Sequence, residues 1–381
     1  AAAAGAVLLT NDGLLPLSEN VSVALVGPFA DSPRHQGAGS SLINPTRLTT
    51  ARAAFAAAGI RHTWDDGSDP ARAARLAAEA DVAVVMVGVP AEFESEGFDR
   101  KRFALPDSHV DLIEQVCRAQ PRAIVVLSNG GPVATPWRSA PAAILETYLG
   151  GQASGAALVD MLFGAVEPGG RLAESFPESV TEMAADQWFP GVPRQVEHRE
   201  GLFVGYRHLV SAGVPAAYPF GHGLGYTTFA WSEAALSDTE VTAGDGATVS
   251  VSVTNTGPRA GSDVVQIYRR DLSGVVLRPQ RELVGFAKVR LGAGESTRVE
   301  IPVPGRGFAF WDRDAHDWEV PGGPFVLEVA RSCVDVVAEL PLTITGGVTT
   351  SPEGPDTPRL SVSDADFERR LGRTIPTPIP M

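Results

Sequence analysis

A cluster of acidic residues follows the most apolar segment of the chain. That segment covers residues 82–89, and Glu92, Glu94, Glu96 and Asp99 come shortly after it. In an α/β protein, the loops at the carboxyl ends of core strands are where chemistry is placed. Because like charges so close together repel, we expect some of these carboxyl groups to have a raised pKa. A carboxylic acid with a raised pKa can serve as a general acid near neutral pH.

Within this cluster, Glu96 has two neighbours that favour a chemical role. Gly97 gives the backbone the freedom to turn tightly and aim the carboxylate. Phe98 supplies apolar surface that would raise the pKa of an acid beside it. The alternative is an ordinary solvated loop in which Asp99 and Arg100 form local ion pairs, because charged loop residues are mostly solvated. The residues alone leave both interpretations open.

A second candidate loop, residues 36–41, is rich in Gly and Ser and follows an expected strand that ends at Val26. It could bring backbone groups and the Ser40 hydroxyl to a ligand, or it could be a plain surface turn. It is not a phosphate-binding loop of known pattern, since it lacks both Gly-x-Gly-x-x-Gly spacing and a Lys-Ser/Thr pair. No Gly-x-Ser-x-Gly nucleophile motif follows a strand either.

The elements that must position these loops alternate between strand and helix. Expected strands cover residues 21–26, 82–89, 123–127 and 143–145, and expected helices cover 51–58, 71–80, 110–119 and 155–163, the last with Ser154 as its N-cap. This alternation predicts an α/β layered domain with a mostly parallel sheet that is covered by helices on both faces.

The pattern changes after about residue 229. In residues 247–254, Val249, Val251 and Val253 share one face, and further short strands are expected at 263–268, 283–289, 296–301, 325–329 and 334–340. Such a rhythm predicts an all-β sandwich of the fibronectin or immunoglobulin type. We expect it to be a scaffold or an interface. The predicted domains are therefore 1–229 (α/β), 230–345 (β-sandwich) and 346–381 (linker and extended Pro-rich tail).

Composition excludes several classes of function. The 381 residues carry a formal net charge of −14, which argues against a nucleic-acid surface. No apolar run approaches the roughly 20 residues of a membrane span. Cys117 and Cys333 are expected to be buried, reduced thiols. The seven histidines fit no metal spacing, so no metal or cofactor is expected, and His208 and His222 are interpreted as structural.

The first residues, four alanines, do not form a signal peptide. They look like the end of a helix running into a strand, as if the chain had been cut. The compartment stays open, with a cytoplasmic location slightly favoured.

Several short motifs occur in order along nearly the whole chain. They are Val7-Leu8-Leu9-Thr10-Asn11-Asp12-Gly13, Gln36-Gly37-Ala38-Gly39-Ser40-Ser41, Glu96-Gly97-Phe98-Asp99-Arg100 with Leu105-Pro106, Pro168-Gly169-Gly170-Arg171-Leu172, residues 200–207, residues 219–229, Arg278-Pro279 and residues 282–286. Their order and spacing resemble the C-terminal half of glycoside hydrolase family 3, the β-glucosidase and β-xylosidase family.

The resemblance implies an enzyme of three parts: a TIM-like barrel, an α/β sandwich and a fibronectin type III-like domain. The barrel, which the resemblance does not include, would carry the catalytic Asp nucleophile. Glu96 matches the family's acid/base Glu, and Ser40 matches a loop residue that can approach the sugar. We expect Phe98 and Arg100 to bind substrate beside them. Thr10, Ala153 and His198 depart from the family's pattern, at positions where Lys, Glu and Tyr are common.

The resemblance also implies a function, namely part of a retaining, exo-acting β-glycosidase, with β-glucosidase favoured. The substrate would be a terminal β-glycoside, and the chain would be inactive without a barrel-containing segment or partner chain. A homo-oligomer is left open. The alternative is a non-catalytic carbohydrate-binding or interaction module that has lost its barrel. A flavodoxin-like nucleotide-binding protein is disfavoured by the missing phosphate motif.

Overall fold

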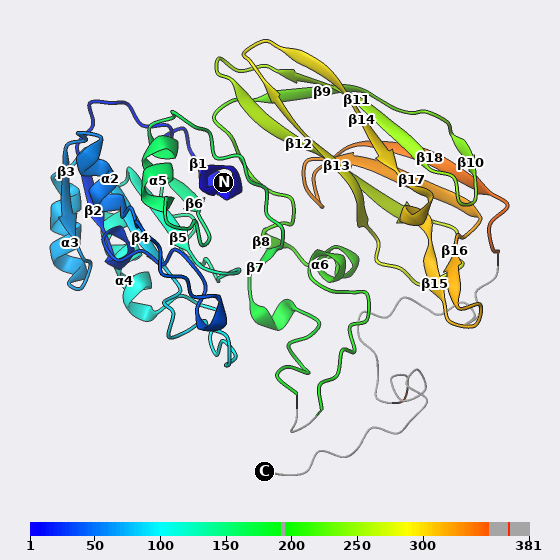
Figure 1. Cartoon of the computed structure of the whole chain (residues 1–381), viewed down its shortest axis with the longest axis horizontal. Helices are drawn as coiled ribbons and strands as arrows, with labels where there is room; N and C mark the ends of the chain where they lie inside the picture. The colour runs from blue at the N-terminus through cyan, green and yellow to red at the C-terminus, as the bar shows by residue number, and fades with distance from the viewer. Residues whose placement is uncertain (192–194, 350–364, 366–381) are drawn as a thin grey trace. The chain divides into compact units, whose positions relative to one another are not determined.

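A computed structural model describes residues 1–191, 195–349 and 365 (Figure 1). The described chain divides into two compact units. The α/β unit consists of Ala1–Glu178, His222–Thr228 and Pro258–Ser262, and the sandwich unit contains Ser179–Gly221, Phe229–Gly257 and the residues from Asp263 onward. Nearly all of the predicted linker and tail lies outside the described residues, including most of residues 364–371, for which the sequence allows a short helix.

The α/β unit is built on a six-stranded sheet with the strand order β1-β6-β5-β4-β2-β3. Its strands are β1 (Val7–Asn11), β2 (Val23–Val26), β3 (His62–Asp65), β4 (Val82–Gly88), β5 (Ala123–Ser128) and β6 (Ala143–Glu146). The pair β1–β6 is antiparallel and the other neighbours are parallel, which confirms the mostly parallel sheet. Strands β2, β4, β5 and β6 are buried along their whole length, as expected of strands covered on both faces.

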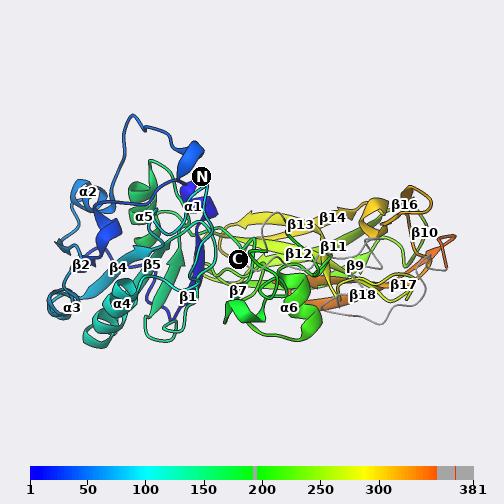
Figure 2. The ribbon, with the colours of Figure 1, turned by 90° about the horizontal axis from the view of Figure 1, so that it is seen from below.

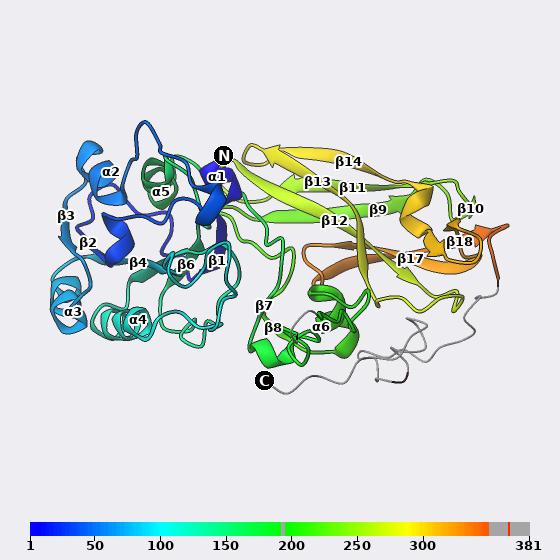
Figure 3. The same cartoon turned by 60° about the horizontal axis from the view of Figure 1, so that its bottom comes forward.

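Helices cover both faces of this sheet. They are α1 (Ala2–Gly5), α2 (Ala51–Ala57), α3 (Pro70–Ala78), α4 (Asp107–Ala119) and α5 (Ser154–Leu162). Figures 2 and 3 show α2 and α5 on one face of the sheet and α3 and α4 on the other, and each pair is in contact. This confirms the predicted layers.

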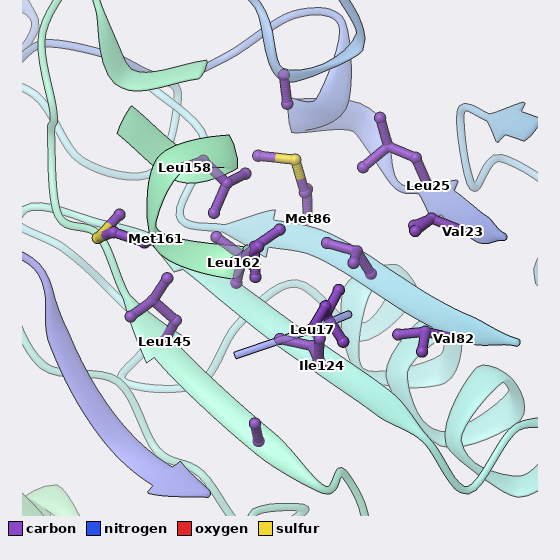
Figure 4. Packing of buried hydrophobic residues seen from close by; sticks show 14 of the residues in the cluster. Leu17, Val23, Leu25, Val82, Met86, Ile124, Leu145, Leu158, Met161 and Leu162 are labelled. Carbon is purple, nitrogen blue, oxygen red and sulfur yellow. The ribbon is translucent and has the colours of Figure 1, made fainter. Parts of the chain in front are cut away.

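The core under α5 shows how the sequence pattern becomes packing. Leu158, Met161 and Leu162 recur at helical spacing and point toward the sheet, into the same buried cluster as Ile124 and Leu145 (Figure 4). All five side chains are almost completely buried. Burying a side chain of this size contributes about 1.5–3 kcal/mol, so this stripe fixes the helix on the sheet and, with it, the ends of the strands.

The predicted N-cap of α5 is wrong by one residue. Ser154 is already helical, the cap position belongs to Ala153, and no side chain caps this helix start. The N–H groups of Ser154 and Gly155 donate instead to the carbonyls of Gly151 and Thr49. Gly155 lies so close to the Thr49 and Thr50 backbone that a Cβ atom would come within 2.5 Å of it. Close packing of this first turn, rather than a cap, determines where the helix begins.

The sandwich unit consists mainly of two facing sheets, with strand orders β10-β18-β17-β12-β13 and β14-β11-β9. The strands are β9 (Phe229–Leu236), β10 (Glu240–Thr242), β11 (Ala247–Asn255), β12 (Gly261–Asp271), β13 (Glu282–Leu291), β14 (Ser296–Val303), β17 (Gly323–Ala330) and β18 (Val336–Thr345). Figure 3 shows β9, β11 and β14 side by side, with β17 and β18 in the other layer. Burial along β11 alternates as predicted, with Val249, Val251 and Val253 inside.

Smaller elements complete the fold. They are β7 (Phe176–Pro177), β8 (Ala216–Tyr218), α6 (Tyr206–Ala212), the hairpin strands β15 (Phe310–Asp312) and β16 (Asp317–Glu319), and four 3₁₀ helices at Pro28–Ala30, Gly39–Ser41, Val180–Glu182 and Gly305–Phe308. Across the residues that the structure describes, no helix is long and apolar enough to span a bilayer. The same residues contain no grouping of three or more His, Cys, Asp or Glu side chains suited to a metal ion.

Two predictions about buried groups are confirmed. Cys117 and Cys333 are free and buried, and burial raises the pKa of each thiol to about 12. The ring nitrogens of His208 and His222 bond backbone carbonyls, those of Glu182 and Leu9 respectively, which is a structural role.

Candidate active site

Three loops meet at the carboxyl edge of the parallel sheet. We name them by the strand they follow: the β2 loop (residues 27–50), the β4 loop (89–106) and the β5 loop (129–142). Strand β4 lies between β2 and β5 in the sheet, so the three loops are neighbours. This edge, where parallel strands end, is the position at which α/β proteins bind ligands.

The structure brings the predicted residues Glu96 and Ser40 into direct contact. The backbone N–H of Ser40 donates a hydrogen bond to Oε2 of Glu96 over 2.6 Å. Ser40 lies in the 3₁₀ turn Gly39–Ser41, and Gly39 has a positive φ of 78°. A Cβ atom on Gly39 would stand 2.5 Å from the Cβ of Glu96, so the contact requires a glycine here.

The predicted raised pKa of the acidic cluster is wrong for Glu96. Hydrogen bonding by Ser40 holds the pKa of the Glu96 carboxyl below its ordinary value of 4.5. The side chain is exposed, so little desolvation opposes this effect. A hydrogen bond to the charged form of an acid favours ionisation, and here it outweighs the desolvation of the carboxylate.

Phe98 lies on the same exposed tip as Glu96. Its side chain is 50% exposed, and the tip is closed by a β-bridge between Ser95 and Phe98, with Gly97 at a φ of 94°. The positive φ confirms that Gly97 allows the tight turn. Phe98 thus presents apolar surface to the solvent on the turn that carries Glu96.

Arg100, predicted to bind substrate, makes its contacts within the protein. Its guanidinium group donates to the carbonyls of Arg102 (2.9 Å), Phe103 (2.8 Å) and Pro132 (2.9 Å). It also lies 3.9 Å from the Glu94 carboxylate. The ion pair considered in the solvated-loop interpretation therefore involves Glu94 instead of Asp99. Three of the five donors of Arg100 are used to fix the β4 and β5 loops.

A second arginine in this region was missed by the sequence analysis. Arg34, from the β2 loop, donates to Oε2 of Glu94 over 2.6 Å and to the Glu94 carbonyl over 3.1 Å. It also bonds the carbonyl of Val89. Oε2 of Glu94 accepts a further hydrogen bond from the Gly130 N–H over 2.9 Å. No sequence signal marks Arg34, because it lies in an irregular polar loop far from the acids.

Two other acids have a raised pKa. Glu146, the last residue of β6, is completely buried, and burial raises its pKa well above the ordinary value. Its oxygens accept from Asn129 Nδ2 (2.6 Å) and the Tyr148 N–H (2.7 Å). Partial burial and the charge of Glu94 also raise the pKa of Glu174. A sequence signal existed for Glu146, an acid that ends the apolar strand Ala143–Glu146.

The arrangement leaves Glu96 able to give or take a proton. Glu94 is held by Arg34 and Gly130, whereas the Glu96 carboxylate is exposed and held by one backbone N–H. Glu96 is therefore free to exchange a proton with a group that binds against the tip. A single carboxylate of this kind can give or take a proton, and it needs a second group to complete a hydrolytic site.

Comparison with known proteins agrees with this architecture. Residues 6–226 match the glycosyl hydrolase family 3 C-terminal domain, and residues 263–333 match the fibronectin type III-like domain. The first match covers more than half of the chain. The chain therefore belongs to glycoside hydrolase family 3.

Individual relatives are similar over most of the chain. Thermostable beta-glucosidase B of Acetivibrio thermocellus is 42% identical over 351 residues, which cover 88% of this chain and 46% of the relative. The exo-alpha-(1->6)-L-arabinopyranosidase of Bifidobacterium breve is 37% identical, over 91% of this chain and 48% of the relative.

Solved structures lead to the same fold. The GH3 beta-glucosidase of Bifidobacterium adolescentis superposes with a TM-score of 0.86 at 37% identity, over 90% of this chain and 52% of that one. The chain spans about half the length of the relatives it matches.

Proposed function

We propose that this chain supplies the general acid/base to a retaining, exo-acting β-glycosidase, with β-glucosidase the favoured activity. The observation that carries the proposal is the Glu96 carboxylate, exposed on the tip of the β4 loop and aimed by the Ser40 N–H. It is supported by family membership and by relatives that are beta-glucosidases. A TIM-like barrel would provide the nucleophile. The barrel would belong either to a longer protein of which this chain is a part or to a partner chain.

The proposed reaction has two steps. A carboxylate nucleophile attacks the anomeric carbon while Glu96 gives its proton to the leaving oxygen. Glu96, now ionised, takes a proton from water, and the resulting hydroxide breaks the glycosyl-enzyme bond. In retaining enzymes the two carboxyl groups stand about 5–5.5 Å apart. Ser40 and Phe98 would contact the substrate next to Glu96.

The lowered pKa of Glu96 constrains this proposal. With Ser40 as its partner the carboxyl is ionised at neutral pH, which is the wrong state for a general acid. A second carboxylate nearby would raise its pKa, because two like charges at such a distance do not both ionise easily. We therefore expect the chain to be inactive without the barrel.

The test is Glu96→Gln in the protein that includes the barrel. The rate on a β-glucoside with a poor, alkyl leaving group should fall by roughly 10²–10⁴-fold, since proton donation contributes that much. A 2,4-dinitrophenyl β-glucoside needs no proton and should lose far less. Glu92→Gln, on the same exposed loop, is the matched control and should leave both rates unchanged.

Two outcomes would contradict the proposal. Equal losses on both substrates would remove the acid role of Glu96. Sugar binding by the chain, with no hydrolysis even when the barrel is present, would favour the non-catalytic carbohydrate-binding module instead.

A further inference from the structure

We propose that Arg34 and Glu94 are positioning residues for Glu96: their ion pair fixes the base of the loop that carries it. The inference rests on the proposed acid/base role of Glu96 and deepens it. Neither residue contacts Glu96 directly, so each acts through the backbone of the β4 loop.

The first observation is where Arg34 holds the loop. Its guanidinium group bonds the carbonyl of Val89, directly after β4, and both the carbonyl and the carboxylate of Glu94. The Arg34 side chain is 6% exposed, and that of Glu94 is 24% exposed. A planar guanidinium that bonds three oxygens at once fixes distance and direction together, which a lysine ammonium does not reproduce.

The second observation is that Glu94 connects a third loop. Its Oε2 accepts from the Gly130 N–H in the β5 loop. A Cβ atom on Gly130 would lie 2.9 Å from this oxygen, so the approach depends on a glycine. The Glu94 carboxylate thus joins the β2, β4 and β5 loops, and Glu94 precedes Glu96 by two residues in the chain.

The third observation is the matching anchor on the other side of Glu96. Arg100 bonds the carbonyls of Phe103 and Pro132, so the loop is fixed at residues 94 and 100. The exposed tip between them, residues 95–99, contains Glu96. The position of the Glu96 side chain therefore depends on the two fixed ends of the tip and on the hydrogen bond from the Ser40 N–H.

Such an arrangement matters for catalysis because proton transfer is sensitive to distance. A displacement of about 1 Å can lower a rate by as much as 100-fold. A variant that loosens the loop at Glu94 should therefore lower the rate of proton transfer by Glu96, although the Glu96 side chain is still present.

The experiment is a double-mutant cycle in the enzyme that includes the barrel. Arg34→Lys and Glu94→Gln are each combined with Glu96→Gln and assayed on the alkyl and dinitrophenyl β-glucosides. Each single variant should lower kcat on the alkyl glucoside by about 10- to 100-fold, with KM little changed. In the Glu96→Gln background, the same change should cost less than about two-fold, because residues that act through one group are not additive.

Arg102→Lys is the matched control. Its side chain lies on the same loop and pairs with Asp107 over 2.5 Å at the surface, so its rates should stay unchanged. If Arg34→Lys does not fold, Glu94→Gln still carries the test, since it keeps the size of the side chain.

Equal losses in both backgrounds, or on both substrates, would overturn the positioning role. The failure of the proposed function is recognised separately, because Glu96→Gln alone would then show no dependence on the leaving group.

Discussion

Glu96 and Glu146 are two acids at the same edge of one sheet with opposite properties. Glu96 lies on an exposed tip after β4, and hydrogen bonding by the side chain and then the backbone N–H of Ser40 lowers its pKa. Glu146 ends β6 in the interior, and burial raises its pKa although it accepts two hydrogen bonds. Desolvation dominates where water is excluded, and hydrogen bonding dominates where it is not.

The difference shows how the residues of this chain alone set the pKa of each acid. Burial raises the pKa of the enclosed Glu146 carboxyl group, whereas hydrogen bonding by Ser40 lowers the pKa of the accessible Glu96. On the proposed acid role of Glu96, its pKa would have to be raised by a second carboxylate and a substrate next to it.

The largest expected effect is a difference in the free energy of unfolding between variants of Glu146 and Glu96. Glu146→Ala would remove the acceptor of the Tyr148 N–H and one of the two acceptors of Asn129 Nδ2, the other being the Gly131 carbonyl. It would also open a cavity, so the free energy of unfolding should fall by about 2–4 kcal/mol. Glu96→Ala should change it by less than about 0.5 kcal/mol. Urea unfolding of both variants measures this. Similar values for the two would mean that the contrast in burial has no energetic consequence.

The next prediction tests the contact between Gly39 and Glu96. Gly39→Ala places a side chain at a φ of 78° and within 2.7 Å of Glu96 Oε2. It should break the Ser40 hydrogen bond, so that the pKa of Glu96 rises toward 4.5, and cost about 1–2 kcal/mol of stability.

Gly59→Ala is the control for this variant. Gly59 has a φ of 68°, and a Cβ atom there would meet nothing within 4 Å. It should show the backbone cost with no change at Glu96. A shift of the Glu96 pKa in both variants would point to a general loosening of the unit.

The third prediction concerns pH. The folded-state pKa of Glu96 is lowered, so its contribution to stability is present above 4.5 and lost as the pH falls through the lowered value. For Glu146 the folded pKa is raised, so the folded state binds more protons and stability declines as the pH rises from the ordinary value toward the raised one. Carboxyl-carbon NMR titration, assigned with the two Gln variants, should show shifts in opposite directions. Parallel titrations would refute the comparison.

The smallest expected effect is that of Phe98→Ala. Half of this side chain is exposed, so stability should change by less than about 0.5 kcal/mol. If Phe98 contacts substrate as proposed, KM for an aryl β-glucoside should rise several-fold in the enzyme with its barrel, with kcat less affected. Phe93→Ala, at an exposed residue before Glu94, is the matched control. An unchanged KM would remove Phe98 from the binding site.

Much of the fold was predictable because it depends on local patterns. The apolar run after residue 81 became the buried strand β4, and the alternation in residues 247–254 became β11. The cap at Ser154 was not predictable, since close packing of Gly155 on Thr50 decides where α5 begins. In the site, the sequence placed Glu96 and Gly97 on one loop, and it gave no indication of Arg34.

The sequence by itself determined that an acidic loop follows a core strand and that a glycine lets this loop turn. The tertiary structure alone decided which groups face each acid. Ser40 is 56 residues from Glu96 along the chain, and Arg34 is 60 residues from Glu94. A pKa and a side-chain position depend on charges, donors and water within a few ångströms, and folding brings those groups from distant parts of the chain.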